Sequence, residues 1–311
     1  MANELALAAM LHLLGGMVLA TLVHQDASLR GHDRPAVLAV ATLVFGLVGA
    51  VAYYAVRERI GDLPADAGRV RSPFDARLWD LFRSVLLIVA AFLCATAIVG
   101  LGANALVAAG VVVRDTLEYR VAASVLQFVG FGVAVAGYLA ITRDWRLVEV
   151  RLPTLRSLGL IVAGVVTLVL AQLAIARLLT VLGVQVAQNQ VVVTGQQDPR
   201  YFLYMIPVAI LLVGPFEELV FRGGVQGILR RTWGPSVAIV VASVLFGLVH
   251  WIALTGAGGS RIPYVTVAAT LGLVLGYLYE RSRNLVVPAV VHGLYNTVLF
   301  GAQYVSATGM V

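Results

Sequence analysis

The sequence has little charge for its length. Asp, Glu, Lys and Arg together make up 12% of the 311 residues, whereas a soluble globular protein has about 25%. Hydrophobic residues make up 60%, and the mean hydropathy is +0.92. This deficit of charge, together with long apolar runs, excludes an ordinary soluble domain and indicates an integral membrane protein.

Lysine is absent, and cysteine occurs once. All 22 basic residues are therefore arginines, and the formal net charge is +6. A basic excess can indicate nucleic-acid binding, but these arginines lie in short loops between apolar runs, as in membrane proteins. We therefore expect no nucleic-acid partner. The single cysteine, Cys94, excludes an intramolecular disulfide.

The N-terminus lacks the features of a secretory signal peptide. It has no basic region before the apolar stretch, the stretch is too long, and a second apolar run follows directly. We interpret residues 5–23 as the first membrane helix. Further runs long enough to cross a bilayer are residues 36–56, 85–102, 121–141, 158–179, 201–230, 235–254, 264–280 and 285–305. The third run is ambiguous, because apolar sequence continues to Val113. The sequence thus predicts an all-α, polytopic bundle of about eight to nine spans.

The arginines also predict an orientation. With the N-terminus inside, fourteen arginines lie in inner loops and seven in outer loops, while Arg222 lies within a span. The excess predicts a multi-pass cell-membrane protein with a cytoplasmic N-terminus. Residues 142–156 form a polar, arginine-rich inner loop that divides accessory helices (1–141) from a C-terminal segment (157–311). The outer loop at 186–200 is polar, and either a lid or a simple connection fits it.

The C-terminal segment carries ionisable side chains inside its spans, where such groups are usually functional. Glu218 lies 13 residues from Arg231, His250 lies 15 from Pro235 and His292 lies 11 from Arg281. At 1.5 Å per residue, these depths are about 20, 22 and 16 Å from the inner ends of three helices. We therefore expect one shared polar site.

Local spacing assigns the side chains to helix faces. Glu218 and Arg222 are four residues apart, which suits an ion pair, and Glu217 points about 100° away from Glu218. The pairs Phe246–His250 and His292–Asn296 have the same four-residue spacing. Gly214 and Pro215 predict a kink or a loosened backbone just before the two acids.

The same residues also have purely structural interpretations. A buried Glu–Arg pair can be a clamp between helices, and a single histidine or asparagine in a span can simply hydrogen-bond a neighbouring helix.

A carboxylate, two histidines and an amide in an apolar site suit hydrolysis of a peptide bond. Glu217 could deprotonate a water molecule with help from His250, while His292 and Asn296 donate hydrogen bonds to the developing oxyanion. Alternatively, Glu217, His250 and His292 could hold a divalent metal such as zinc. The HExxH motif is absent, and no serine or cysteine lies beside a histidine as a nucleophile would.

Three short motifs resemble those of the CPBP family of intramembrane proteases, which comprises type II CAAX prenyl endopeptidases and bacteriocin-processing relatives. They are EELVFR at 217–222, FGLVH at 246–250 and HGLYN at 292–296, in order on three apolar helices. The resemblance covers residues 157–305.

This resemblance implies an intramembrane endopeptidase acting on a membrane-embedded or prenylated substrate. It implies Glu217, His250, His292 and Asn296 as catalytic residues, with Glu218, Arg222 and Phe246 supporting them. The family is described both as metalloproteases and as metal-free glutamate proteases, and we favour the metal-free mechanism here. Two other functions fit the same residues: a non-catalytic immunity or scaffold factor, and a proton-coupled transporter.

Overall fold

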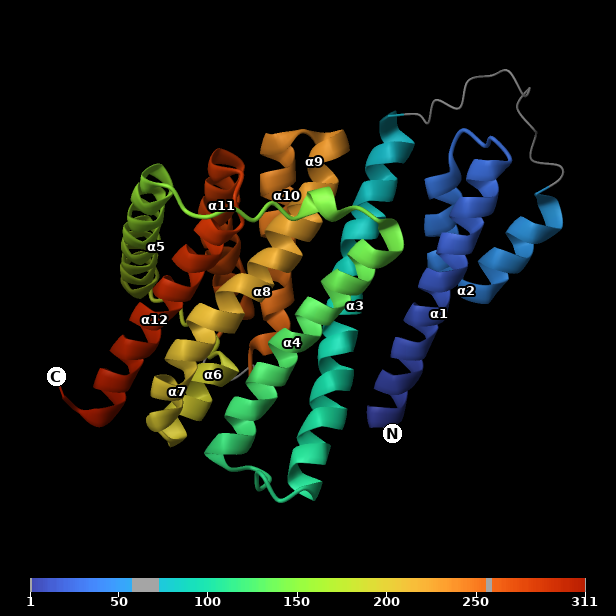
Figure 1. The fold of residues 1–311 in the computed structure, drawn as a ribbon. Helices are drawn as coiled ribbons and strands as arrows, with labels where there is room; N and C mark the ends of the chain where they lie inside the picture. The colour runs from blue at the N-terminus through green and yellow to red at the C-terminus, as the bar shows by residue number, and fades with distance from the viewer. Residues whose placement is uncertain (1, 58–72, 256–258, 311) are drawn as a thin grey trace. The chain divides into compact units, whose positions relative to one another are not determined.

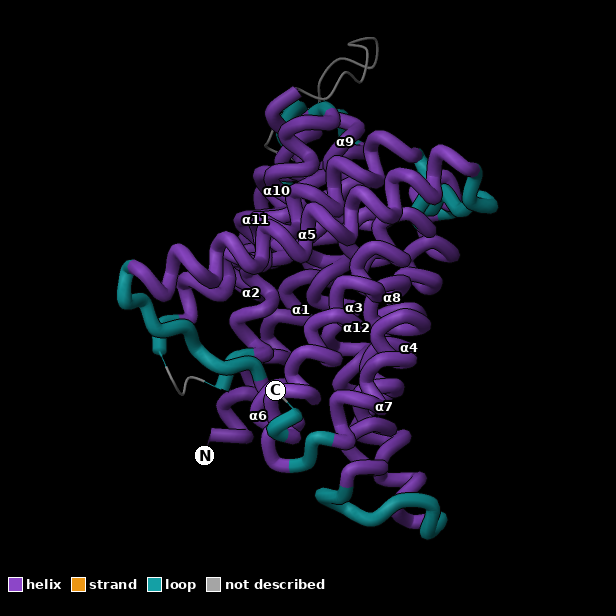
Figure 2. Tube along the Cα trace, turned by 90° about the vertical axis from the view of Figure 1, so that its left-hand side faces the viewer, coloured by secondary structure: helices purple, strands orange, loops and turns teal. Residues whose placement is uncertain are grey.

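The computed structural model describes residues 2–57, 73–255 and 259–310, with side chains from residue 15 onward. This described part is helical throughout, apart from connecting loops and two isolated β-bridges (Figure 2). The all-α prediction is therefore confirmed.

The chain forms two compact units, residues 1–86 and 87–311. The predicted boundary after residue 141 rests on the distribution of polar residues in the spans, which is a different criterion, and it stays a prediction. The helix α3 (Pro73–Ala108) contributes to both units.

The first unit is built on α1 (Ala2–Leu29) and α2 (Pro35–Val56), which pack along each other. Small side chains allow this close packing, since Ala20, Ala27, Ala39 and Ala50 are all buried. Asp75 of α3 accepts a hydrogen bond from the Ala36 backbone nitrogen at 2.8 Å, which satisfies one of the free N–H groups at the start of α2.

The second unit contains the remaining helices (Figure 1). They are α4 (Leu117–Thr142), α5 (Leu155–Val181), α6 (Gln190–Gln197), α7 (Arg200–Val208), α8 (Gly214–Glu218), α9 (Gly227–Trp233), α10 (Pro235–Val249), α11 (Arg261–Ser282) and α12 (Val286–Thr308). Short 3-10 segments follow α4 at Trp145–Leu147 and α10 at His250–Ala253. The helix α12 packs against α5, α7, α8 and α11, and α10 packs along α11.

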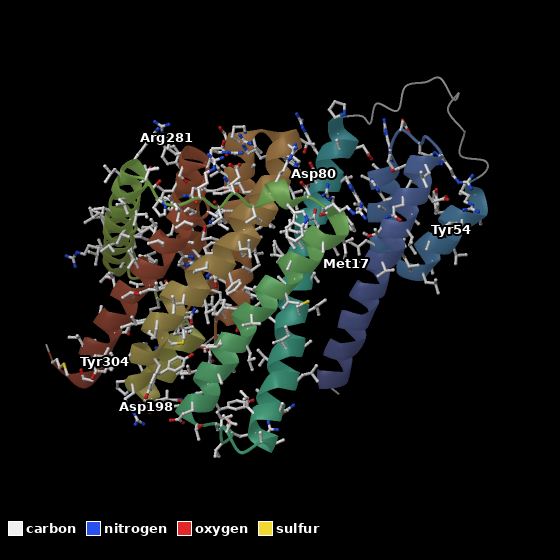
Figure 3. All side chains as sticks on the ribbon, viewed as in Figure 1. Met17, Tyr54, Asp80, Asp198, Arg281 and Tyr304 are labelled. Carbon is white, nitrogen blue, oxygen red and sulfur yellow. The ribbon has the colours of Figure 1, made fainter. Side chains whose placement is uncertain are left out.

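Seven helices in the described part are long and apolar enough to cross a membrane, so the protein is a multi-pass membrane protein. They are α2, α3, α4, α5, the continuous helix 200–233, α10 with its 3-10 extension, and α11. The helix α12 carries His292 and Asn296 and is not among the seven; the count of eight to nine spans stays a prediction. Figure 3 shows Asp198 and Arg281 at opposite ends of the second unit, as the alternating spans predict.

The outer surface of α5 illustrates how these helices suit lipid. Leu158, Val162, Val166 and Leu170 follow one another at four-residue spacing and are exposed. The opposite face contributes Ile161 and Leu168 to a core shared with α11 and α12. A stripe of exposed leucine and valine beside a packed stripe is what a lipid-facing helix of a bundle needs.

The arginine-rich loop 142–156 runs across one end of the second unit, from α4 to α5 (Figure 1). Leu147 is buried, and its carbonyl oxygen accepts a hydrogen bond from the Tyr279 hydroxyl at 3.2 Å. The Asn284 side chain bonds both the backbone nitrogen and the carbonyl oxygen of Arg151. This loop therefore ties the end of α4 to the junction of α11 and α12.

The helix that carries the two glutamates is continuous from Arg200 to Trp233 but irregular. It widens into π-helix at Ala209–Val213 and again at Leu219–Gln226, on either side of α8. Pro207 and Pro215 lack the backbone N–H that an α-helix requires, which accounts for a loosened backbone in this region. The loosening predicted from Gly214 and Pro215 is confirmed, and π-helical turns are common at functional sites.

A glycine contact sets the distance between α8 and α12. A Cβ atom on Gly214 would lie 2.3 Å from the Ala289 carbonyl oxygen and 2.8 Å from the Gly293 backbone nitrogen. Any larger residue would push the two helices apart. Because Glu217 and Glu218 follow Gly214 by one turn and His292 precedes Gly293, this contact brings the acids and the histidine together.

Candidate active site

Glu218 is the fully buried carboxylate of the site and has two partners. Its Oε2 atom accepts a hydrogen bond from Arg222 Nε at 3.0 Å, and its Oε1 atom accepts one from His292 Nδ1 at 3.0 Å. Neither Glu218 nor Arg222 is exposed. The predicted pair Glu218–Arg222 is confirmed, whereas the contact with His292 was not expected. One buried carboxylate thus links the long helix to α12.

The contact with Glu218 fixes the tautomer of His292. A carboxylate oxygen accepts, so Nδ1 carries the hydrogen, and the other ring nitrogen faces away from Glu218. That nitrogen, Nε2, lies 4.0 Å from Glu217 Oε2. This separation is longer than a direct hydrogen bond and allows a third polar group to bridge the two. His292 therefore lies between the carboxylates of Glu218 and Glu217.

Glu217 differs from its neighbour in both exposure and partners. Its side chain is 15% exposed, and it makes no hydrogen bond to any residue in the described ranges, although its Oε2 atom is buried. The two adjacent glutamates thus face different surroundings, as their 100° separation predicts. A carboxylate with open hydrogen-bonding capacity at the edge of a buried cluster is suited to bind a reacting molecule.

His250 lies where α10 ends and its 3-10 extension begins. Its Nδ1 atom donates a hydrogen bond to the Phe246 carbonyl oxygen at 2.7 Å, because a carbonyl can only accept. The neutral ring therefore has an unprotonated Nε2 atom, the form that a general base requires. His250 makes no hydrogen bond to Glu217 in the structure, so the predicted cooperation of the two stays a prediction.

Phe246 packs at the centre of the cluster. Its ring centroid lies 4.6 Å from that of His250 and 5.9 Å from that of His292, and the Arg222 guanidinium carbon lies 5.4 Å above it. The predicted packing of Phe246 beside His250 is confirmed. Through this one ring, the motifs of α10, α12 and the long helix meet at a common level.

Asn296 lies one turn beyond His292 on α12 and is half-buried. Its side chain makes no hydrogen bond with the described residues. It is therefore free to bind a ligand, and its predicted part in oxyanion stabilisation stays a prediction.

The alternative prediction of a metal site concerns Glu217, His250 and His292. Over residues 2–57, 73–255 and 259–310, no three His, Cys, Asp or Glu side chains come together as a metal-binding group. Binding of a metal by these three residues stays a prediction. Two of them, Glu217 and His292, do approach each other.

The sequence did not predict a group of buried polar atoms that involves Arg222. Both Nη atoms of Arg222, Gln226 Oε1 and Ser243 Oγ are buried and have no hydrogen-bond partner among the described residues. A Cβ atom on Gly276 would lie 3.0 Å from Gln226 Oε1 and 3.6 Å from Arg222 Nη1. The four-residue spacing of Gln226 from Arg222 is the signal that could have revealed this group.

Fold and site together define a class: polytopic helical membrane proteins with a buried cluster of glutamate, arginine and histidine. Within the chain, residues 199–298 match the family model described as Type II CAAX prenyl endopeptidase Rce1-like. This segment is similar to the Rce1-like domain, and it contains every candidate site residue from Glu217 to Asn296. The match begins after α5, so it is shorter than the resemblance expected over 157–305.

The chain is also similar to a protein of Bacillus subtilis (strain 168) named "Putative membrane peptidase YdiL". The two are 28% identical over 96 residues, which make up 30% of this chain and 36% of that relative. The chain thus matches about a third of the curated relative's length. No solved structure matches the chain significantly.

Proposed function

We propose that the protein is an intramembrane endopeptidase that hydrolyses a peptide bond of a membrane-associated or lipidated substrate. The observation that carries this proposal is the arrangement of Glu217 opposite His292, with His292 held by the buried Glu218–Arg222 pair. The match of this segment to the Rce1-like model and the named peptidase relative support the same class.

In this mechanism, Glu217 and His250 activate a water molecule for attack on the scissile carbonyl. The water oxygen bonds to the carbonyl carbon while its proton passes to Glu217 or to His250 Nε2. The same group then returns the proton to the nitrogen of the leaving amine as the peptide bond breaks. Each proton transfer needs a group with open hydrogen-bonding capacity, as Glu217 and His250 have.

The oxyanion is stabilised by His292 and Asn296. His292 donates from Nε2 when it is protonated, and the contact of its Nδ1 atom with Glu218 holds the ring in place. Asn296 donates from its amide one turn further along α12. A preorganised donor of this kind contributes about 10²- to 10³-fold to the rate.

The substrate class follows from the location of the site. A site within a multi-pass bundle receives polypeptides that are embedded in the membrane or attached to it by a lipid. Processing of a CAAX-type C-terminus is the specific case that we propose, with the N-terminus of this protein on the cytoplasmic side.

The test uses purified protein in detergent or nanodiscs and an internally quenched, farnesylated CaaX peptide. We expect cleavage by the wild type and a loss of at least about 10³-fold for Glu217→Gln. Comparison of membrane proteomes from cells with the wild type or Glu217→Gln would identify natural precursors that accumulate. Equal cleavage by the two proteins would exclude the assigned role of Glu217.

A chelator in the same assay separates the two mechanisms. Because we favour the metal-free mechanism, we expect the rate with excess chelator to stay within about twofold of the untreated rate, far from the loss that removal of a catalytic group causes. Loss of cleavage that zinc restores would instead support the metal mechanism. Counterflow uptake without cleavage would favour a transporter, and cellular function that survives Glu217→Gln would favour a non-catalytic factor.

A further inference from the structure

Tyr264 lies beside the candidate catalytic residues but belongs to none of the three motifs. It is in the first turn of α11, and its ring centroid lies 6.3 Å from that of His250, with the planes tilted by 32°. Tyr264 therefore lies beside His250, one of the two residues that we propose to activate water.

The hydroxyl of Tyr264 has a hydrogen that the described residues do not use. Asn189 Nδ2 donates to the Tyr264 oxygen at 2.9 Å. An amide N–H donates and cannot accept, so the phenol accepts in this contact and its own O–H remains available. Tyr264 makes no second hydrogen bond within the described part of the chain. Tyr264 is half-buried, and its O–H can therefore donate to a ligand oxygen that enters the site beside His250.

Asn189 is itself held in place, so the orientation of the phenol is built into the fold. Its Oδ1 atom accepts a hydrogen bond from the Val191 backbone nitrogen at 2.8 Å and caps α6, which leaves its Nδ2 atom to face Tyr264. Asn189 also forms a β-bridge with Leu254, four residues after His250. The amide cannot turn over without losing both side-chain contacts.

We propose that Tyr264 is a further catalytic residue, whose phenol donates a hydrogen bond to the substrate carbonyl oxygen as that oxygen gains negative charge. This inference rests on the proposed protease function. A phenol keeps its proton at neutral pH and cannot serve as the base. Unlike His292, which donates from Nε2 only when protonated, Tyr264 donates in every protonation state of the histidines. Asn189 is then a positioning residue.

The first experiment compares Tyr264→Phe with the wild type in the peptide-cleavage assay. We expect kcat to fall about 10²- to 10³-fold, the loss typical of one oxyanion donor, with KM within about twofold. Tyr277→Phe is the matched control, because it removes the hydroxyl of a tyrosine on the same helix that is 59% exposed. Its kcat should equal that of the wild type.

Substitutions of Asn189 separate catalysis from simple support of the loop. Asn189→Asp keeps the cap of α6 but presents an acceptor, so the phenol donates to it and its hydrogen is withdrawn from the site. Asn189→Ser also keeps a cap, yet it is too short to reach the phenol. We expect Asn189→Asp to lose kcat as Tyr264→Phe does, and Asn189→Ser to lose about tenfold at most.

The outcomes distinguish this inference from the function on which it rests. If the wild type cleaves, Glu217→Gln does not, and Tyr264→Phe has wild-type kcat, the role of Tyr264 is excluded and the protease proposal stands. Equal losses for Asn189→Ser and Tyr264→Phe would show that the hydroxyl only anchors the loop. If Tyr264→Phe does not fold, the contrast between Asn189→Asp and Asn189→Ser decides. No cleavage by the wild type would overturn both proposals.

Discussion

The long helix has an arginine–carboxylate pair at its start and another in its middle, and the two pairs differ in their surroundings. Asp198 and Arg200 stand at the start of α7, with side chains 33% and 72% exposed, and Arg200 Nη2 lies 2.7 Å from Asp198 Oδ2. Glu218 and Arg222, in the middle of the helix, are both fully buried. Water competes for the contacts of the exposed pair, whereas the buried pair depends on its protein partners.

The full burial of Glu218 and Arg222 indicates a role other than stabilising the fold. A buried ion pair gains little net stability, because the desolvation of both charges offsets their attraction. Glu218 also binds His292, and Arg222 lies over the Phe246 ring. We therefore interpret the buried pair as a device that orients His292 and the exposed pair as a local contact of the helix start.

The largest expected effect comes from breaking the buried pair. Arg222→Met leaves the carboxylate of Glu218 buried without its cationic partner, which costs about 3–5 kcal/mol. The free energy of unfolding in mixed micelles, measured by SDS titration, checks this. Arg200→Met is the matched control and should unfold like the wild type, because its guanidinium is exposed. Equal stability of the two variants would contradict the contrast.

A double variant separates stability from orientation. Glu218→Leu with Arg222→Met removes both buried charges, and we expect its unfolding free energy to return to within about 2 kcal/mol of the wild type. We expect the double variant not to cleave the peptide, because Nδ1 of His292 has lost its carboxylate partner. A double variant that is stable and still cleaves would show that the pair does not orient His292.

The sequence predicted most of the fold because apolar length is a local property. The predicted run 158–179 becomes α5 at Leu155–Val181, and the run 235–254 becomes α10 with its extension to Ala253. The helix α3 begins twelve residues earlier than the run at 85, because its first turns are polar. The helix α6, with its polar sequence and a cap from Asn189, lay in a segment expected to be a lid or a connection.

The candidate site was predictable as far as helix spacing reaches. Four-residue spacing predicted the pair Glu218–Arg222 and the packing of Phe246 on His250. The contact between Glu218 and His292 depends instead on how closely α8 approaches α12. The glycines at this approach, Gly214 and Gly293, lie far apart in the sequence, so the residue spacing within one helix does not reveal it. Tyr264 was missed for a similar reason, because α11 carries no motif and the partner of Tyr264 lies 75 residues earlier.

A smaller effect is expected from the glycine contact that brings the buried pair to His292. In Gly214→Ala, the new Cβ atom meets the Ala289 carbonyl oxygen, so α8 and α12 must separate. Overpacking of this kind costs about 1–3 kcal/mol. Separation of the helices also weakens the bond from His292 to Glu218, so we expect cleavage to fall with stability.

The control for this substitution is Gly159→Ala on α5, where an added Cβ meets no atom within 4 Å. Such a change restricts the unfolded chain and should stabilise the protein by about 0.4–1 kcal/mol. Unfolding free energies and cleavage rates of both variants check the prediction. A Gly214→Ala protein as stable and active as Gly159→Ala would show that the close approach of α8 to α12 is dispensable.

The smallest expected effect comes from the exposed pair itself. Hydrogen bonds from Arg200 lower the pKa of Asp198 below its usual value of 3.8, and slight burial opposes this shift. A lowered pKa in the folded state means that the contribution is present above pH 3.8 and is lost as the pH falls through the lower, folded value. We expect Asp198→Asn to change the melting temperature by less than about 2 °C at pH 7, because exposed pairs are screened by water. The difference between variant and wild type should shrink as the pH falls below 3.8 and vanish once the pH is below the lowered pKa of the folded state, where the carboxyl group of the wild type is also protonated. A difference of many degrees at pH 7, or one that does not shrink as the pH falls below 3.8, would mean that Asp198 holds the start of α7 by more than its charge. The contrast with the buried pair would then no longer be one of solvent exposure.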